Sequence, residues 1–193
     1  MSDTTAAPET NKTRPSKPET ERQGFVHLYT GNGKGKTTAA LGLALRAAGH
    51  RHRVYIGQFL KGMPYGENLI LAGHDLITVE QYGTEECVAF GTLREEHRVA
   101  AREGLERSRV ALESGEYELV VLDEVDVAIW FGALEVEEVL EVVDARPDHV
   151  ELVLTGRRAP RALKDRAHLI TEMREVRHYY ADKGVTSREG VEY

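Results

Sequence analysis

The chain of 193 residues contains a single cysteine, Cys87, so no disulfide can form within it. That cysteine usage is typical of proteins from a reducing compartment. No apolar run approaches the roughly 18 residues that a membrane-spanning helix needs, and the N-terminal segment lacks the apolar core of a signal peptide. We therefore expect a soluble, cytoplasmic protein without a membrane partner.

An excess of basic residues is also missing, since 25 Lys and Arg face 32 Asp and Glu, for a formal net charge of −7. Proteins that bind nucleic acid normally present a basic face or stripe, so this balance argues against a nucleic-acid partner. The acidic net charge does not exclude a local group of cations that holds a phosphate. Hydrophobic residues make up 41% of the chain, which is enough for one sizeable core, and the length suits one domain.

Large apolar side chains are nearly absent from residues 1–23, which also contain three of the six prolines, Pro8, Pro15 and Pro18. Such a segment cannot bury enough apolar surface to offset the entropy lost on ordering. We predict a flexible tail at residues 1–23 and a single domain at residues 24–193. The alternative is a tail that becomes ordered over a bound ligand.

From residue 24 onward, strand-like and helix-like patterns alternate. Strands are predicted at 25–29, 53–59, 75–82, 117–123, 150–155 and 168–173, the last as a central strand. Helices are predicted at 37–48, 93–112, 125–144 (in two pieces around Gly132) and 161–167, with a helical turn at 67–71. In the first helix, Leu41, Leu45 and Ala48 have the spacing of an apolar stripe. Because strands that alternate with helices form parallel sheets, we predict an α/β fold with helices on both faces of a mostly parallel sheet.

A glycine-rich loop, Thr30-Gly-Asn-Gly-Lys-Gly-Lys-Thr-Thr38, joins the first predicted strand to the first helix. Its glycines let backbone amides approach phosphate oxygens, and the start of the following helix adds partial positive charge. Lys36 supplies a full charge and Thr37 a hydroxyl for Mg²⁺. The usual pattern has a glycine where Thr30 stands. The candidate ATP-binding residues are Gly31, Asn32, Gly33, Lys34, Gly35, Lys36, Thr37 and Thr38. A glycine-rich turn without a ligand is the alternative, but the Gly-Lys-Thr-Thr ending argues against it.

Charged residues follow two other predicted strands. Asp123 and Glu124 end an apolar strand, and ligands bind at the carboxyl edge of open α/β sheets. Either carboxylate can hold Mg²⁺ directly or through water, or one of them can cap a helix. Arg157 and Arg158 follow another strand, and either could reach a triphosphate or remain solvated.

The remaining candidates carry weaker signals. Trp130 and Phe131 lie on a predicted helix, which favours packing in the core over a ligand platform. The eight histidines show no metal-ligand spacing, and no Ser-His-Asp arrangement has a supporting local context. We interpret Cys87 as a packed or incidental thiol rather than a nucleophile.

Five segments together resemble one known family, the ATP:corrinoid adenosyltransferases of the cob(I)alamin type with a phosphate loop. They are the loop itself, Gln58-Phe-Leu-Lys-Gly62, Leu122-Asp-Glu124, Leu154-Thr-Gly-Arg-Arg-Ala-Pro160 and Thr171-Glu-Met173. The resemblance covers residues 24–193 and implies a P-loop NTPase-like (RecA-like) fold. It also implies transfer of the 5′-deoxyadenosyl group of ATP to the Co(I) centre of a reduced corrinoid, with release of triphosphate, in adenosylcobalamin biosynthesis or salvage.

In that family Co(I) is the nucleophile, which agrees with the lack of a convincing protein nucleophile in this sequence. The resemblance makes Lys36 and Arg157 candidate catalytic residues, because the departing triphosphate needs cations. It makes Thr37 and Glu124 candidate ligands of Mg²⁺. Family members bind ATP in reverse along the loop relative to ordinary P-loop enzymes, and the departure at Thr30 is compatible with that. A homodimer is also implied, and an electron-donating flavoprotein is a candidate partner.

The loop after the family's third strand carries a Phe and a Trp that press on the lower face of the corrinoid. Here that loop reads Gln81-Tyr-Gly-Thr-Glu-Glu-Cys-Val-Ala-Phe90 and contains no tryptophan. Its aromatic residues, Tyr82 and Phe90, are the candidate corrinoid contacts, with Phe90 as a substitute for the family's pair. Two other functions remain as alternatives: a P-loop phosphotransferase or NTPase with another acceptor, and a nucleotide-binding regulatory module without turnover.

Overall fold

The computed structural model describes residues 22–86, 88 and 90–193. Most of the predicted tail, residues 1–21, and Cys87 therefore lie outside the described residues. Arg22 contacts the domain, because its guanidinium lies 3.2 Å from Nδ1 of His52 and donates to the carbonyl oxygen of Glu118 at 3.4 Å.

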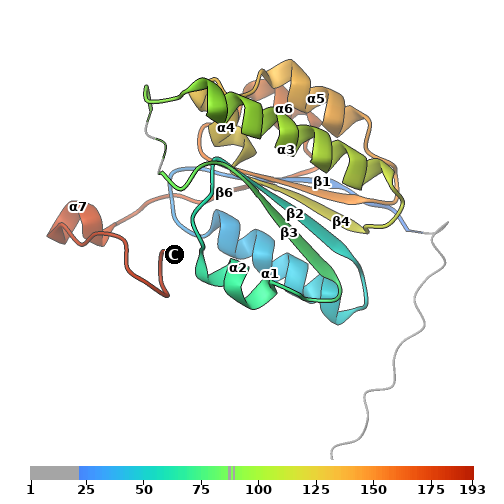
Figure 1. Cartoon of the computed structure of the whole chain (residues 1–193), viewed down its shortest axis with the longest axis horizontal. Helices are drawn as coiled ribbons and strands as arrows, with labels where there is room; N and C mark the ends of the chain where they lie inside the picture. The colour runs from blue at the N-terminus through green and yellow to red at the C-terminus, as the bar shows by residue number, and fades with distance from the viewer. Residues whose placement is uncertain (1–21, 87, 89) are drawn as a thin grey trace, which may run out of the picture.

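Six parallel strands form the centre of the molecule (Figure 1). They are β1 (Val26–Thr30), β2 (Val54–Phe59), β3 (Ile77–Tyr82), β4 (Leu119–Asp123), β5 (Glu151–Thr155) and β6 (Leu169–Glu172). Their order across the sheet is β3-β2-β4-β5-β1-β6, and every neighbouring pair is parallel. The predicted α/β fold with a parallel sheet is confirmed.

Helices cover both faces of the sheet (Figure 1). The helices α1 (Lys36–Gly49) and α2 (Gly66–Leu71) lie on one face; α3 (Glu95–Glu113), α4 (Val125–Phe131), α5 (Val136–Asp144) and α6 (Arg161–Arg166) lie on the other. A short helix that the sequence did not predict, α7 (Tyr179–Lys183), stands outside these layers. In the described part of the chain, no helix has both the length and the apolar character needed to cross a membrane.

The last strand corrects the sequence interpretation, because β6 lies at the edge of the sheet and not in its centre. Its partner is β1, and all four of its residues are exposed, including Leu169 and Ile170. After Glu172 the chain leaves the sheet toward α7 instead of forming another covering helix (Figure 1). An apolar run of four residues predicts a strand but does not reveal whether a helix covers it.

Small residues bring α1 close to the sheet. The buried residues of its apolar stripe are Ala40, Ala44 and Ala48, which pack with Val121 of β4. The predicted stripe was wrong at Leu45, whose side chain is 54% exposed. Alanine at each turn of the helix lets α1 approach the strands closely, and the register places the larger leucine on the outer side. This close contact fixes the start of α1, and with it the phosphate loop, at the carboxyl edge of the sheet.

Candidate active site

The glycine-rich loop curves between β1 and α1 and packs against the backbone that follows β6. The N–H of Gly33 donates to the carbonyl oxygen of Met173 at 2.7 Å. A Cβ atom would lie 2.4 Å from that oxygen at Gly31 and 2.7 Å at Gly33, so a side chain at either position would displace the loop. Gly35 has a φ of 113°, a left-handed conformation that glycine adopts without strain. Glycine at these three positions is therefore required by the form of the loop.

Lys36 is the first residue of α1, and its ammonium lies inside the curve of the loop. Nζ donates to the carbonyl oxygens of Gly31 at 2.9 Å and Gly33 at 2.8 Å. Burial lowers the pKa of Lys36, and the charge of Glu124 opposes this shift. The loop thus holds a lysine charge beside its inward-facing backbone, which suits the binding of a phosphate group.

Asp123, at the end of β4, is the centre of a polar network below the loop. Its Oδ1 accepts hydrogen bonds from the hydroxyls of Thr37 (2.8 Å) and Thr155 (2.7 Å). Its Oδ2 pairs with Nζ of Lys61 at 2.8 Å. Burial opposes ionisation, but Lys61 and the two hydroxyls hold the pKa of Asp123 below its ordinary value. Asp123 is therefore a buried anion that orients the loop threonine and Lys61, which follows the neighbouring strand β2.

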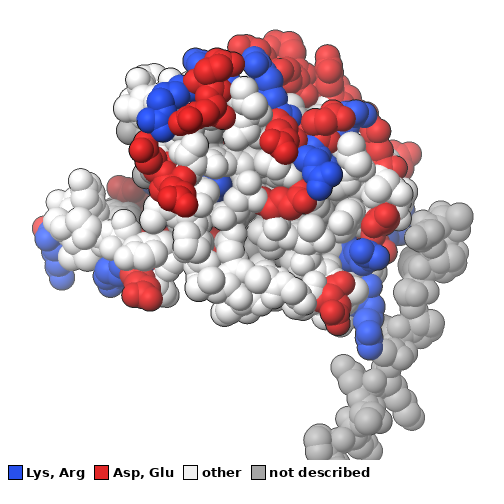
Figure 2. Space-filling view, viewed as in Figure 1, with Lys and Arg blue, Asp and Glu red and all other residues white. Residues whose placement is uncertain are grey.

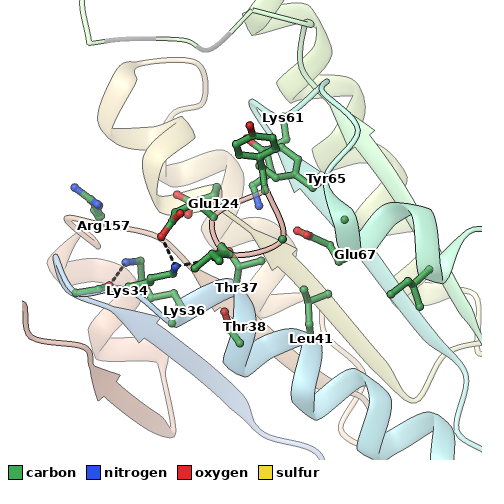
Figure 3. Close-up of a pocket in the computed structure, with 18 of the residues that line it drawn as sticks. Lys34, Lys36, Thr37, Thr38, Leu41, Lys61, Tyr65, Glu67, Glu124 and Arg157 are labelled. Atoms are coloured by element: carbon green, nitrogen blue, oxygen red, sulfur yellow. Dashed lines mark hydrogen bonds and ion pairs between the residues drawn. The ribbon is translucent and has the colours of Figure 1, made fainter. Parts of the chain in front are cut away.

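Glu124 has a left-handed backbone with a φ of 63°, which is uncommon for a residue with a side chain. Its N–H donates to the hydroxyl of Thr155 at 2.9 Å, which helps to hold this turn. Burial and the neighbouring charge of Asp123 raise the pKa of Glu124. Its side chain lines the same cavity as Lys36 and Arg157 (Figure 3). A partly desolvated carboxylate beside a phosphate-binding loop suits a divalent cation.

The structure brings most of the predicted site residues together in one cavity of about 580 Å³ (Figure 3). The predicted residues that line it are Gly33, Lys34, Gly35, Lys36, Thr37, Thr38, Glu124 and Arg157. Gly31 belongs to the same loop through its bond to Lys36, and Asn32 is exposed. The volume lies in the range of pockets that hold small ligands and cofactors.

Several lining residues were not among the predicted site residues. Lys61 lines the cavity next to Tyr65 and Glu67, and a separate segment, Gly190–Tyr193, closes part of its outer side. Lys61 follows the end of β2, which neighbours β4. Its place at the carboxyl edge of the sheet, which made Asp123 a candidate, therefore makes Lys61 a candidate as well. Nothing local in the sequence indicates the contact of residues 190–193.

The candidate corrinoid residue Phe90 lies in an aromatic cluster with Trp130 and Phe131. Its ring is stacked on Trp130, with the centroids 5.4 Å apart and 22° between the planes, and meets Phe131 edge-on at 5.8 Å. The guanidinium of Arg158 lies 4.6 Å from the Trp130 centroid. Phe90 is 66% exposed and Trp130 is partly buried, so Trp130 belongs to the surface cluster rather than to the core.

Tyr82, the second candidate corrinoid contact, lies between β3 and α3. It is 7% exposed, and its ring packs against Gly104 of α3. Its hydroxyl donates to the Glu80 carboxylate and lies 2.9 Å from the hydroxyl of Tyr55. Of the two candidates, Phe90 is the one that the structure exposes to a ligand.

Comparison with known proteins assigns this arrangement to one family. Residues 22–193 match the family described as ATP:corrinoid adenosyltransferase BtuR/CobO/CobP. The chain is 36% identical to the corrinoid adenosyltransferase CobA of Salmonella typhimurium over 180 residues, which cover 90% of this chain and 87% of the relative. Identity to the corrinoid adenosyltransferase of Escherichia coli is 34% with the same coverage. Identity to that of Pseudomonas aeruginosa is 31% over 174 residues, or 90% of this chain and 85% of the relative.

Proposed function

The chain belongs to the ATP:corrinoid adenosyltransferase family, enzymes that transfer the adenosyl group of ATP to a corrinoid, and we propose that it delivers this group to Co(I). In the proposed step, Co(I) supplies the electron pair for a new bond to C5′ of ATP. The bond between C5′ and the oxygen of the α-phosphate breaks, and the whole triphosphate leaves. The observation that carries the proposal is the cavity in which the phosphate loop, Lys36, Glu124 and Arg157 meet.

We propose that the loop binds the leaving group rather than a group that is transferred. Lys36 and Arg157 line the same cavity, so both can approach the oxygens that gain charge as triphosphate departs.

The donor atoms beside the loop fit Mg²⁺. The described residues contain no group of three or more His, Cys, Asp or Glu side chains that could hold a metal ion by themselves. Mg²⁺ at nucleotide sites, however, is usually held by one or two protein oxygens together with phosphates and water. The Thr37 hydroxyl and the Glu124 carboxylate would hold it in this chain, and the ion would neutralise part of the triphosphate charge. Asp123 would keep the Thr37 hydroxyl in position.

For the corrinoid, we propose that Phe90 and Trp130 form the contact surface. Trp130 comes from α4, yet it lies directly against Phe90, so the cluster contains the Phe and Trp combination that the loop sequence lacks. Arg158, next to the proposed phosphate contact Arg157, lies over the same tryptophan. The aromatic cluster and the ATP cavity are thus linked by two consecutive arginines, which would keep the two substrates close.

The proposed setting is the cytoplasm, with a homodimer as the active form and an electron-donating flavoprotein as the source of Co(I). The exposed apolar side chains of α1 and α2 support a contact between copies of the chain, with Leu45 at 54% and Leu69 at 71% exposure.

Incubation with ATP, Mg²⁺ and chemically reduced cobalamin tests the proposed function. We expect a light-sensitive cobalt–carbon bond to form in step with free triphosphate, measured by the cobalamin spectrum and by phosphate-chain chromatography. Lys36→Ala should remove most of this activity, because the loop loses its charge on the leaving group. An unchanged cobalamin spectrum with ADP as the product would contradict the proposal and favour a phosphotransferase.

A further inference from the structure

A mostly buried lysine, Lys61, lines the ATP cavity beside Tyr65 (Figure 3). Its side chain is only 13% exposed, and its ammonium pairs with the buried carboxylate of Asp123 at 2.8 Å. Burial alone would lower the pKa of Lys61, but the charge and the hydrogen bond of Asp123 outweigh it and raise the pKa. The cavity therefore contains a lysine charge in addition to those of the phosphate loop and Arg157.

The backbone around Lys61 has an uncommon form. Leu60 has a φ of 54°, in the left-handed region that residues with a side chain seldom adopt. Glycines let the end of β2 touch the loop after β3. A Cβ atom at Gly62 would lie 2.4 Å from the carbonyl oxygen of Thr84, and one at Gly83 would lie 2.5 Å from the backbone nitrogen of Lys61. Strained backbone of this kind is concentrated at functional sites, and here it precedes a lysine that lines the cavity.

The ammonium of Lys61 has donor capacity beyond its bond to Asp123. An ammonium carries three N–H donors. Within the described residues its hydrogen-bond acceptor is Oδ2 of Asp123, and the ring of Tyr65 lies 4.9 Å from Nζ. The Asp123 carboxylate also accepts hydrogen bonds from two threonine hydroxyls and from Nε2 of Gln58 at 3.3 Å. The ammonium can therefore bind a ligand oxygen while Asp123 keeps other donors.

Lys61 and Arg157 reach the cavity from opposite sides of Glu124. The strand order places β4 between β2 and β5, and these three residues follow β2, β5 and β4 respectively. Figure 3 shows Lys61 and Arg157 on the two sides of Glu124, with Lys36 between them and the loop. Breaking the bond between C5′ and its oxygen leaves one more negative charge on the triphosphate. Cations placed along this anion stabilise that charge as it develops.

We propose that Lys61 binds the triphosphate directly, as a third cation beside Lys36 and Arg157, and that Asp123 directs its ammonium before ATP binds. The proposal rests on the proposed function, because it assigns a further residue to the leaving group. The competing explanation is a structural lysine that neutralises Asp123 and affects the loop only through that carboxylate and Thr37.

A double-mutant cycle separates these two roles, because Asp123→Asn removes the anion through which a structural lysine would act. The Kd of magnesium tripolyphosphate is measured by calorimetric titration for Lys61→Met, with and without Asp123→Asn. We expect Lys61→Met to raise this Kd about tenfold in both backgrounds. Lys164→Met, at an exposed lysine of α6, is the matched control and should leave the Kd unchanged. Near-UV circular dichroism checks that each variant is folded.

No effect of Lys61→Met in the Asp123→Asn background would overturn the proposal, because the lysine would then act only through Asp123. Lys61→Gln gives the same decision in a chain that keeps this carboxylate, since glutamine can still donate a hydrogen bond to Asp123 but carries no charge. We expect it to weaken tripolyphosphate binding as much as Lys61→Met does. Full affinity in Lys61→Gln would overturn the proposal.

Turnover provides a second readout. With chemically reduced cobalamin and saturating ATP, Lys61→Met should lower kcat as well as weaken binding, because the charge on the triphosphate increases as it leaves. An unchanged kcat would contradict a contact with the leaving group in the transition state. If the unmodified protein forms no adenosylated corrinoid, the proposed function fails, whereas the Kd values still decide whether Lys61 binds phosphate.

Discussion

Gly31 and Gly33 lie against the carbonyl oxygen of Met173, and this contact sets the curve of the phosphate loop. On the inner side of that curve, Lys36 bonds to the carbonyl oxygens of the same two glycines. Below it, Asp123 holds the Thr37 hydroxyl. Gly33, Lys36 and Thr37 thus have partners within the chain that fix their direction before a ligand binds. Such preorganisation favours electrostatic stabilisation of a leaving group, because little reorganisation is needed during the reaction.

Phe90→Ala should slow adenosylation more strongly with Co(II) and a protein reductant than with chemically reduced Co(I). The proposed reason is that pressure of Phe90 and Trp130 on the corrinoid is needed for the reduction and not for the transfer itself. An aromatic pair of this kind contributes about 0.5–1.5 kcal/mol beyond its buried area, so a several-fold change in the ratio of the two rates is expected. Stopped-flow spectroscopy of the cobalamin measures both rates.

Trp130→Leu should change the same ratio in the same direction, because Trp130 supports the Phe90 ring. Phe25→Ala is the matched control, since Phe25 is also an exposed aromatic residue, at 40%, but precedes β1 and lies at the opposite end of that strand from the phosphate loop. Equal losses in both assays for Phe90→Ala would show that Phe90 does not act on the reduction.

At the scale of elements, hydrophobic periodicity predicted most of the fold. The six strands and the helices of the two covering layers lie within a few residues of their predicted positions, because each has a period that packing against the sheet preserves. The loop at Thr30–Thr38 and the acids at Asp123–Glu124 were predictable from their place after strands. Periodicity could not predict that β6 is an edge strand, or that Trp130 lies beside Phe90, because both depend on contacts between distant segments. The short helix α7 and residues 188–193 are held by Glu192 rather than by a core, so they leave no apolar pattern.

Glu80→Gln should destabilise the contact of β2 and β3 with α3. The Glu80 carboxylate accepts hydrogen bonds from Tyr55 of β2 (2.7 Å), Tyr82 of β3 and Arg107 of α3 (3.1 Å). Burial raises the pKa of Glu80, but these three donors outweigh it and leave the pKa below its ordinary value. Loss of the charged acceptor should lower the free energy of unfolding by about 1–2 kcal/mol at pH 7.

The difference between the unmodified chain and Glu80→Gln should depend on pH. A carboxylate whose pKa is lowered by folding stabilises the fold above its unfolded pKa, and this contribution is lost as pH falls through the folded value. Urea unfolding should therefore show a difference at pH 7 that shrinks below about pH 4. Glu103→Gln, at an exposed position of α3, is the control and should show no such trend. A difference that stays constant with pH would contradict the prediction.

At the scale of the whole molecule, charge is unevenly distributed. Figure 2 shows charged side chains gathered over α3 and α5, while the surface over α2 in the same view carries few of them. The exposed side chains of α1 and α2 include Leu45 and Leu69. A surface with exposed apolar groups and little charge is typical of a contact between proteins. A second copy of the chain is the partner we propose for it.

Leu69→Asp should weaken the homodimer, because it places a charge in the proposed contact, where desolvation makes it unfavourable. Light scattering and sedimentation over a range of concentrations should show a dimer for the unmodified chain and at least about tenfold weaker association for the variant. Val99→Asp is the matched control, because Val99 is 57% exposed on α3, on the opposite face of the sheet. A monomer at every concentration would contradict the dimer. Equal effects of the two substitutions would place the contact elsewhere. A monomer, or a contact elsewhere, would not contradict the proposed ATP cavity, because its phosphate loop and the Asp123 network lie within one chain.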